Sequence, residues 1–333
     1  MAGYDRYMAV LDGQRPDLLP RLPILMQFAA EFIGSNYGAF ASDYRVLVEA
    51  NQRCIEHFGF DQLSAISDPY RETQGFGADI EFVRDGVPRC LKPPLEDDKD
   101  FTKLPTPDPH RSERMLDRVR GVEAFKDWGH RIYSILGWVE GPAAEAATLR
   151  GSTNFLMDLM LDPGYTCELM DLCVEVGIAF GRAQFDAGAD TMGVGDAIAS
   201  QVSADVYREL IFPREQRLFD GLHEAGGLVR LHICGDITHL LPHIAELHVD
   251  IVDLDWQVDV AEARRILGRG KVLCGNIDPA EAVLRSTPDR IKAAIRAIYE
   301  TVGDPYMVGA GCEIPSGTPN ENLAALCDPV VCG

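Results

Sequence analysis

Extended apolar runs alternate with helical stretches along most of this 333-residue chain. Eight such runs are expected to be strands, and helical sequence follows each of them. Eight β-then-α units in a chain of this length are typical of a (β/α)8 barrel, and they fit an open doubly wound sheet less well. The expected strands cover residues 22–28, 61–67, 132–139, 189–194, 228–232, 250–255, 271–275 and 306–311. The expected helices cover residues 4–12, 42–58 with Ser42 as N-cap, 111–128, 163–187, 203–224, 258–267 and 287–302.

Residues 75–109 interrupt this alternation. Glycine and proline recur throughout the stretch, around a hairpin-like segment at residues 80–87. We therefore expect a small insertion, such as a β-meander, within one barrel domain that spans residues 1–333. The helix at residues 4–12 would form an N-terminal helical extension of that barrel.

Composition and charge exclude several classes of partner. A net charge of −21 would repel the phosphates of nucleic acids and of anionic membrane surfaces. The sequence shows neither a secretory signal pattern nor an apolar run long enough to cross a membrane. Its nine cysteines lack a tight disulfide framework, which is typical of a reducing compartment. These features predict a cytoplasmic protein, and they leave its oligomeric state open.

Two of the expected strands end in side chains that can bind a metal. His232 and Cys234 share one face of the fifth strand, and Cys312 follows the eighth. In a barrel both ends lie at the same mouth, where active sites form. Imidazole and two thiolates suit zinc, and three protein ligands leave an open, catalytic position. Glu313 or Asp255 could fill that position in the absence of substrate, and Cys274 is a reserve ligand. The alternative is that these cysteines are inert packing residues.

Other polar and aromatic residues follow the expected strands at the same level of the barrel. Each alone could be a cap or turn residue, but their convergence at one mouth predicts a site. The candidate catalytic residues are Glu140, Asp196, Asp255 and Asn276. The candidate substrate-binding residues are Gln27, Phe28, Asp68, Tyr70 and Trp256.

Six motifs carry a family resemblance: Glu-Gly-Pro at 140–142, Gly-Ala-Asp at 188–190, Leu-His-Ile-Cys-Gly at 231–235, Gly-Asn-Ile-Asp-Pro at 275–279, Gly-Cys-Glu-Ile-Pro at 311–315 and Thr-Pro-Asn-Glu-Asn at 318–322. With these motifs the sequence resembles the uroporphyrinogen decarboxylase superfamily, and more closely its zinc-dependent corrinoid methyltransferase branch, which includes methylcobamide:coenzyme M methyltransferases and O-demethylase methyltransferases. The resemblance covers most of the chain from about residue 130 to residue 325. By this resemblance His232, Cys234 and Cys312 correspond to the zinc ligands of that branch. The sequence differs in ending at Gly333, where relatives usually continue a final helix, and in lacking the decarboxylase signature near the first strand.

The resemblance implies Zn2+ and a corrinoid such as cobalamin as cofactors. The motif Asp-x-His-x-x-Gly, whose histidine binds cobalt, is absent from the sequence; residues 220–226 come near it with one residue too many. We therefore expect the corrinoid to arrive on a separate partner protein. Among the mouth residues Arg71 is the main candidate cation, and it could simply pair with Glu72 or Asp68. The mouth thus favours a small methyl donor, such as a methoxylated aromatic compound. Its apolar and aromatic side chains are expected to be Met26, Phe28, Phe32, Tyr37, Tyr70, Trp138 and Trp256.

Three other functions remain open at this point. The first is methyl transfer from a methylcorrinoid to a thiol that resembles coenzyme M, because zinc can also activate a thiol. The second is porphyrinogen decarboxylation, which is disfavoured because residues 23–41 carry Glu31 and no Arg or Lys to hold several carboxylates. The third is a barrel that binds a ligand or partner without catalysis.

Overall fold

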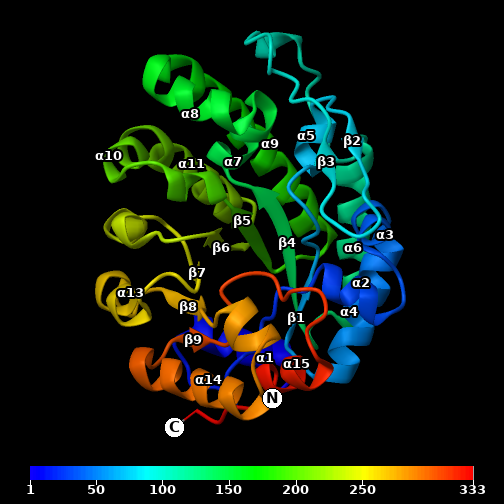
Figure 1. Cartoon of the computed structure of the whole chain (residues 1–333), viewed down its shortest axis with the longest axis vertical. Coiled ribbons are helices and arrows are strands. Elements are labelled where there is room, and N and C mark those ends of the chain that lie inside the picture. Colours follow the sequence, from blue (N-terminus) through cyan, green and yellow to red (C-terminus); the bar gives the residue numbers. More distant parts are fainter. Residues whose placement is uncertain (333) are drawn as a thin grey trace.

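The computed structural model describes residues 1–332. Within that range seven parallel strands form one curled sheet in the order β1-β4-β5-β6-β7-β8-β9. Helices surround the sheet, as Figure 1 shows. The expected (β/α)8 barrel class is confirmed. The strands of the sheet are β1 (Gln62–Ser64), β4 (Ser134–Glu140), β5 (Thr191–Gly195), β6 (Leu228–Ile233), β7 (Ile251–Leu254), β8 (Val272–Gly275) and β9 (Tyr306–Met307).

An extended segment at residues 20–24 closes the barrel between β9 and β1, where a strand at residues 22–28 was expected. The Leu22 amide donates to the Val308 carbonyl, and the Val308 amide donates to the Pro20 carbonyl. On the other side, the Asp61 amide donates to the Arg21 carbonyl. The expected strand is wrong because Pro20 and Pro23 have no N–H to donate to a ladder. Helix α2 (Gln27–Phe32) then begins where that strand would have continued.

The seven expected helices are present, two of them with differences, and further short helices were not expected. Ser42 ends α3, its hydroxyl donating to the Gly38 carbonyl, and the side chain of Asp43 caps the next helix instead. The expected helix at 203–224 contains a π-helical turn at Tyr207–Ile211. The remaining helices are α1 (Gly3–Leu11), α3 (Tyr37–Ser42), α4 (Tyr44–Phe58), α5 (Arg71–Gly75), α6 (Glu113–Gly129), α7 (Pro142–Arg150), α8 (Ser152–Leu161), α9 (Pro163–Ala187), α10 (Ala204–Val206), α11 (Phe212–Glu224), α12 (Leu241–Ile244), α13 (Val260–Leu267), α14 (Pro288–Val302) and α15 (Asn320–Leu326).

The insertion between α5 and α6 is small and partly extended. It contains an antiparallel pair formed by β2 (Ile80–Glu81) and β3 (Arg89–Cys90), followed by a short 3-10 turn at Phe101–Lys103. In Figure 1 it is the cyan segment that rises beside the sheet toward α8. The insertion predicted around residues 75–109 is confirmed.

Helix α1 packs against the barrel interior. Its Tyr7 is buried and its hydroxyl lies 2.6 Å from the Thr191 hydroxyl, at the start of β5. Tyr7 also packs in one cluster with Val272, at the start of β8, and with Met307 of the short strand β9. The N-terminal end of the barrel is therefore filled by side chains, and the opposite end remains for a site. Among residues 1–332 no helix combines the length and the apolar content needed to span a membrane.

Candidate metal and substrate site

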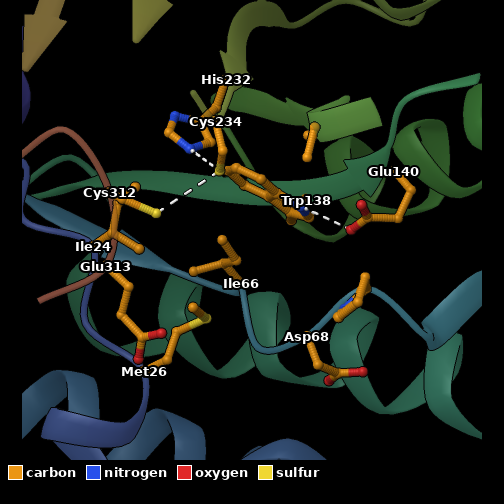
Figure 2. A pocket seen from close by; sticks show the side chains of 13 residues that line it. Ile24, Met26, Ile66, Asp68, Trp138, Glu140, His232, Cys234, Cys312 and Glu313 are labelled. Carbon is orange, nitrogen blue, oxygen red and sulfur yellow. Dashed lines mark hydrogen bonds between the residues drawn. The ribbon is translucent and has the colours of Figure 1, made fainter. Parts of the chain in front are cut away.

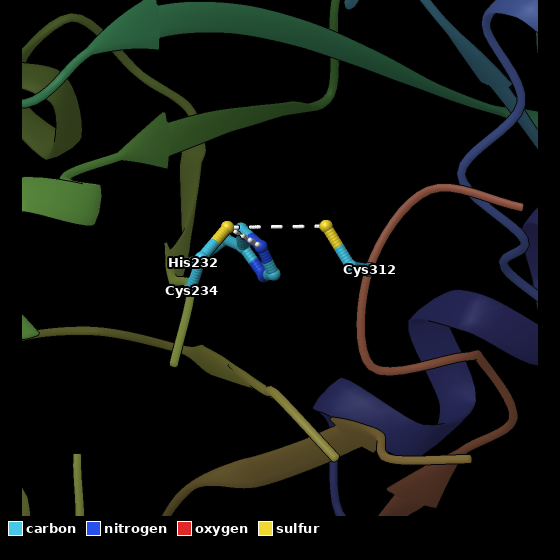
Figure 3. Close-up of side chains that lie close together, drawn as sticks. All are labelled: His232, Cys234 and Cys312. Carbon is cyan, nitrogen blue, oxygen red and sulfur yellow. Dashed lines mark hydrogen bonds between the residues drawn. The ribbon is translucent and has the colours of Figure 1, made fainter. Parts of the chain in front are cut away.

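Three metal-capable side chains meet at the C-terminal mouth of the barrel. His232 lies near the end of β6, Cys234 follows directly, and Cys312 lies in the loop after β9, on the other side of the mouth (Figure 3). The Cys234 sulfur is 3.0 Å from His232 Nε2 and 3.8 Å from the Cys312 sulfur. All three ligand atoms lie within 4.8 Å of one another. The structure thus brings together the three residues that the sequence placed at two facing strand ends.

This donor set fits a zinc ion. Two thiolates bound tetrahedrally at about 2.3 Å would lie about 3.8 Å apart, which is the sulfur separation found here. The hydrogen bond from Cys234 lowers the pKa of the Cys312 thiol to about 5, so one thiolate is already favoured. Glu313 and Asp255, the expected fourth ligands, are not members of the cluster. The Glu313 carboxylate instead accepts the backbone N–H of Gln27 at 2.8 Å.

A buried relay of polar side chains lies behind His232. Its Nδ1 lies 3.3 Å from the carboxylate of Asp253, which pairs with His232 across β6 and β7. Arg230 holds that carboxylate at 2.7 Å and donates to Gln62 at 2.9 Å. A carboxylate behind a histidine fixes the ring and presents the other nitrogen to a metal. The sequence analysis did not predict this relay, although Arg230 and His232 lie two residues apart in one strand and therefore share a face.

A cavity of 160 Å³ adjoins the cluster. Figure 2 shows the cluster at one end, Glu140 at the other, and the Trp138 indole between them. Within residues 1–332 its lining contains three acids and no Lys or Arg. It is therefore a small, mainly apolar site with an acidic character. The lining residues are Ile24, Met26, Ile66, Asp68, Pro69, Trp138, Glu140, Gly195, Ala197, His232, Cys234, Cys312 and Glu313.

Glu140 closes the end of the cavity opposite the metal cluster. Its Oε1 accepts hydrogen bonds from Arg71 at 2.6 Å and from the Trp138 indole N–H at 3.1 Å. Burial raises the pKa of Glu140 to about 8, against the opposing effect of Arg71. Arg71 also lies 3.6 Å from Glu72, so this cation pairs with acids and does not line the cavity. Of the two partners expected for Arg71, Glu72 is present, whereas Asp68 pairs with Arg114 instead. Glu140 is a partner that was not expected.

Asp68 lies at the same end of the cavity, and its carboxylate is fully engaged. It accepts from Arg114 at 2.6 Å and from the Ser67 hydroxyl at 2.7 Å, and its other oxygen accepts the Tyr70 amide at 3.0 Å. Burial alone would raise the pKa of Asp68, but Arg114 and then Arg71 lower it to about 2. Asp68 is therefore an ionised structural anchor of this wall.

The pairing of Asp68 predicts a specific loss of stability in acid. Because the pKa of Asp68 is about 2 when folded and lies near 3.8 when unfolded, its contribution is present above about pH 4 and is lost as the pH falls toward 2. The stability advantage of the wild type over Asp68→Asn should shrink by about 2.5 kcal/mol across this window. Denaturant unfolding at several pH values measures it, with the exposed Asp85→Asn as control. An advantage that stays constant down to pH 2.5 would contradict the assignment.

Two glycines of β5 let the Trp138 indole lie flat against that strand. A Cβ at Gly193 would stand 2.2 Å from the indole, and one at Gly195 would stand 2.9 Å from it. The aromatic wall of the cavity therefore depends on the missing side chains of the neighbouring strand.

Gly193→Ala is expected to displace the indole and to destabilise the protein by about 1–3 kcal/mol, because the core is overpacked. Denaturant unfolding and tryptophan fluorescence measure both effects. Gly270→Ala, where a Cβ meets nothing within 4 Å, is the matched control. Equal stability of the two variants would show that Trp138 adapts without cost.

Several predicted residues lie near the cavity without lining it. The Asp196 carboxylate accepts the Ala144 amide at 2.6 Å, at the start of α7, and burial raises its pKa to about 7. The side-chain amide of Asn276 donates to the carbonyls of Asp255 and Val258. The Asp255 carboxylate accepts the Gln257 amide in a turn. These three side chains hold loops in place around the mouth.

The predicted substrate-binding residues are also dispersed. Phe28 is buried and packs against Phe32 and Phe58. Gln27 supports Glu313 through its backbone, and Tyr70 supports Asp68 in the same way. Trp256 is 48% exposed. Of the predicted mouth residues outside the cluster, Asp68, Glu140, Met26, Trp138 and Glu313 line the cavity. Sequence reasoning missed Ile24, Ile66, Pro69, Gly195 and Ala197, which carry no chemical signal of their own.

Comparison with known proteins places the chain in a family. Residues 3–331 match the sequence model of uroporphyrinogen decarboxylase (URO-D). The chain belongs to this family. It is 30% identical to a uroporphyrinogen decarboxylase from Nocardia farcinica over 82% of this chain and 76% of that one. It is 24% identical to the methylcobamide:CoM methyltransferase MtaA from Methanosarcina barkeri over 96% and 95% of the two chains.

A solved structure supports the same fold. A methyltransferase from Methanosarcina mazei superposes with a TM-score of 0.90 at 20% identity, over 98% of this chain and 97% of that one. The family expected from the sequence motifs is therefore confirmed, and it includes both decarboxylases and methyltransferases among the relatives of this chain.

Proposed function

We propose that this chain is a single-domain, zinc-dependent methyltransferase that moves a methyl group from a small methyl ether to the cobalt of a corrinoid. The observation that carries the proposal is the cluster of His232, Cys234 and Cys312 at one end of an apolar cavity. A ligand set of one imidazole and two thiolates is typical of zinc, and three protein ligands leave one position for a substrate.

The side chains of this chain have separate tasks in that reaction. His232, Cys234 and Cys312 hold the zinc, and Asp253 orients the histidine ring. Bound there, zinc would supply a Lewis acid for the leaving oxygen of the donor. Trp138 and the aliphatic wall bind the apolar body of the donor and exclude water from it. The loops anchored by Asp196, Asp255 and Asn276 keep this mouth in shape.

The corrinoid is proposed to be carried by a separate protein. The sequence lacks the Asp-x-His-x-x-Gly pattern that binds cobalt, and the cavity of 160 Å³ is too small for a tetrapyrrole. The relative MtaA is named a methylcobamide:CoM methyltransferase. The methyl group would therefore be exchanged at the mouth, where a docked partner can reach it.

Two features of the cavity disfavour decarboxylation of a porphyrinogen. That substrate carries several carboxylates, and Arg or Lys side chains are the usual means of holding such groups. The lining residues described here include Asp68, Glu140 and Glu313 and no Arg or Lys. Carboxylates facing carboxylates would repel a polyanionic substrate.

Methyl transfer to a thiol is the second candidate function. A relative that is 24% identical over 96% of this chain is named as a methylated-thiol:coenzyme M methyltransferase, from Methanosarcina mazei. A zinc-bound thiol would occupy the same open position. An anionic thiol, however, would find no cation among the described lining residues.

The test combines metal analysis with two assays. Purified protein should hold one zinc per chain, and it should convert cob(I)alamin to methylcobalamin when it is given methoxylated aromatic compounds. The reverse assay supplies methylcobalamin and small thiols. Thiol methylation without methylcobalamin formation from any ether would make the second candidate correct. Protein that binds no zinc even after reconstitution would exclude both methyltransferase functions.

A further inference from the structure

We propose that Glu140 selects the donor: the cavity takes a single-ring methyl ether with a hydroxyl group opposite its methoxy group, and it rejects donors with an anion in that place. This inference rests on the proposed function for the methoxy end of the donor. The recognition of the hydroxyl end rests on the geometry around Glu140.

The cavity has two chemically different ends. The metal cluster lies at one end and Glu140 at the other, with the Trp138 indole between them (Figure 2). A ring that presents its methoxy oxygen to the cluster therefore directs the opposite ring position toward Glu140. A para substituent meets Glu140, whereas an ortho substituent stays near the cluster.

The size of the cavity limits the donor to one ring. Its volume is 160 Å³. An apolar cavity of about 150 Å³ in another protein is known to accept benzene. The flat face of Trp138 suits an aromatic ring, which prefers offset or edge contacts with an indole. A fused or two-ring donor would not fit within these walls.

Glu140 has one oxygen left for a ligand. Its Oε1 accepts from Arg71 and Trp138, whereas its Oε2 has no hydrogen-bond partner within residues 1–332. The side chain is 9% exposed, on the wall of the cavity. Asp68, the neighbouring acid, is saturated by Arg114, Ser67 and the Tyr70 amide. Among the described side chains that line this end of the cavity, the acid oxygen left free is therefore Glu140 Oε2.

The charge at this end favours a neutral hydroxyl group over an anion. Burial raises the pKa of Glu140 to about 8, and a protonated Glu140 can donate from the free oxygen while Oε1 accepts from Arg71 and Trp138. A hydroxyl group can both donate and accept, so it matches Glu140 in either protonation state. A carboxylate would meet two acidic side chains, Glu140 and Asp68, and the described lining offers no Arg or Lys to pair with it.

Binding measured by calorimetry on the zinc-loaded protein, without corrinoid, tests this recognition. The probes are 4-methoxyphenol, methoxybenzene, 2-methoxyphenol and 4-methoxybenzoate. We expect 4-methoxyphenol to bind about tenfold more tightly than each of the other three, because only it places a neutral hydroxyl group at Glu140. Equal binding of 4-methoxyphenol and methoxybenzene would overturn the proposal.

Variants assign the preference to one residue. Glu140→Met should reduce the difference between 4-methoxyphenol and methoxybenzene to less than about twofold, whereas Glu140→Gln should keep most of it, since the amide still forms hydrogen bonds. The exposed Glu31→Gln is the control and should bind all probes as the wild type does. If Glu140→Met does not fold because Arg71 loses its partner, the double variant Arg71→Met/Glu140→Met replaces it. A preference that survives in the Met variant would overturn the proposal.

Failure of this inference is distinguishable from failure of the proposed function. Hydroxyl-dependent binding that requires Glu140 supports the recognition even if no ether yields methylcobalamin. Turnover of 4-methoxyphenol and methoxybenzene at equal affinity overturns the role of Glu140 and leaves methyl transfer intact.

Discussion

A Cys312→Ala protein is expected to bind zinc at least about a hundredfold more weakly than the wild type while remaining folded. The substitution removes one of three ligands that lie within 4.8 Å of one another. The fold should persist because the buried core between sheet and helices, and not the metal, supplies stability. Competition with a chelator measures the affinity, and circular dichroism measures the fold. Methyl transfer should be lost together with the zinc.

His232→Ala and Cys234→Ala are expected to behave in the same way. Cys274→Ala is the matched control, because Cys274 is a buried cysteine that lies outside the cluster. It should bind zinc as the wild type does. Full zinc content and activity in Cys312→Ala would remove the site as described, and loss of zinc in Cys274→Ala would bring that residue back as a ligand.

The second large effect is expected at Arg230. Its guanidinium is 1% exposed and lies 2.7 Å from the Asp253 carboxylate, which is itself fully buried. Arg230→Met would leave that carboxylate buried without a cation, and this should lower the free energy of unfolding by about 3–5 kcal/mol. Denaturant unfolding measures the change. Arg217→Met removes an exposed ion pair with Asp171 and is the control. It should lower the free energy of unfolding by less than about 1 kcal/mol.

A double variant separates stability from metal binding at this position. Arg230→Met/Asp253→Leu removes both buried charges and should recover much of the lost stability. It also deprives His232 of its carboxylate, so zinc affinity should still fall about 10–100-fold. Zinc affinity equal to that of the wild type in the double variant would mean that the ring of His232 is oriented by packing alone.

The parts of the fold that sequence predicts well have strong periodic signals. The helix expected at residues 163–187 is α9 with the same bounds, because its apolar positions recur at helical spacing over seven turns. Strands β5 to β8 are short apolar runs that lie within or close to the expected ranges. The segment at residues 22–28 has a similar apolar run, but Pro23 prevents regular pairing, and propensity alone does not reveal this.

The sequence predicts a residue of the candidate site only where its side chain has a distinctive chemical function. His232, Cys234 and Cys312 stand out because imidazole and thiol groups at facing strand ends suggest a metal. Ile24 and Ile66 line the same cavity but look like any core residue in the sequence. Phe28 shows the opposite case: it was expected to bind substrate, and the start of α2 turns it into the core, against Phe58.

The seam at residues 20–24 has a consequence for how donors of different width can be accommodated. Elsewhere around the barrel, neighbouring strands pair in regular register over two to five residues. Here the neighbouring segments are joined by scattered backbone bonds at Pro20, Arg21, Leu22 and Ile24. This segment carries Ile24 into the cavity, and Met26 follows it just before α2. His232 lies near the end of the well-paired strand β6, and Cys234 follows that strand directly. The aliphatic side chains at this seam are thus carried by a different segment from His232 and Cys234. Cys312, by contrast, lies in the loop between Val308 and Ile314, both of which bond to the seam. Substitutions in this seam can therefore change which donors the cavity accepts without changing the geometry of β6.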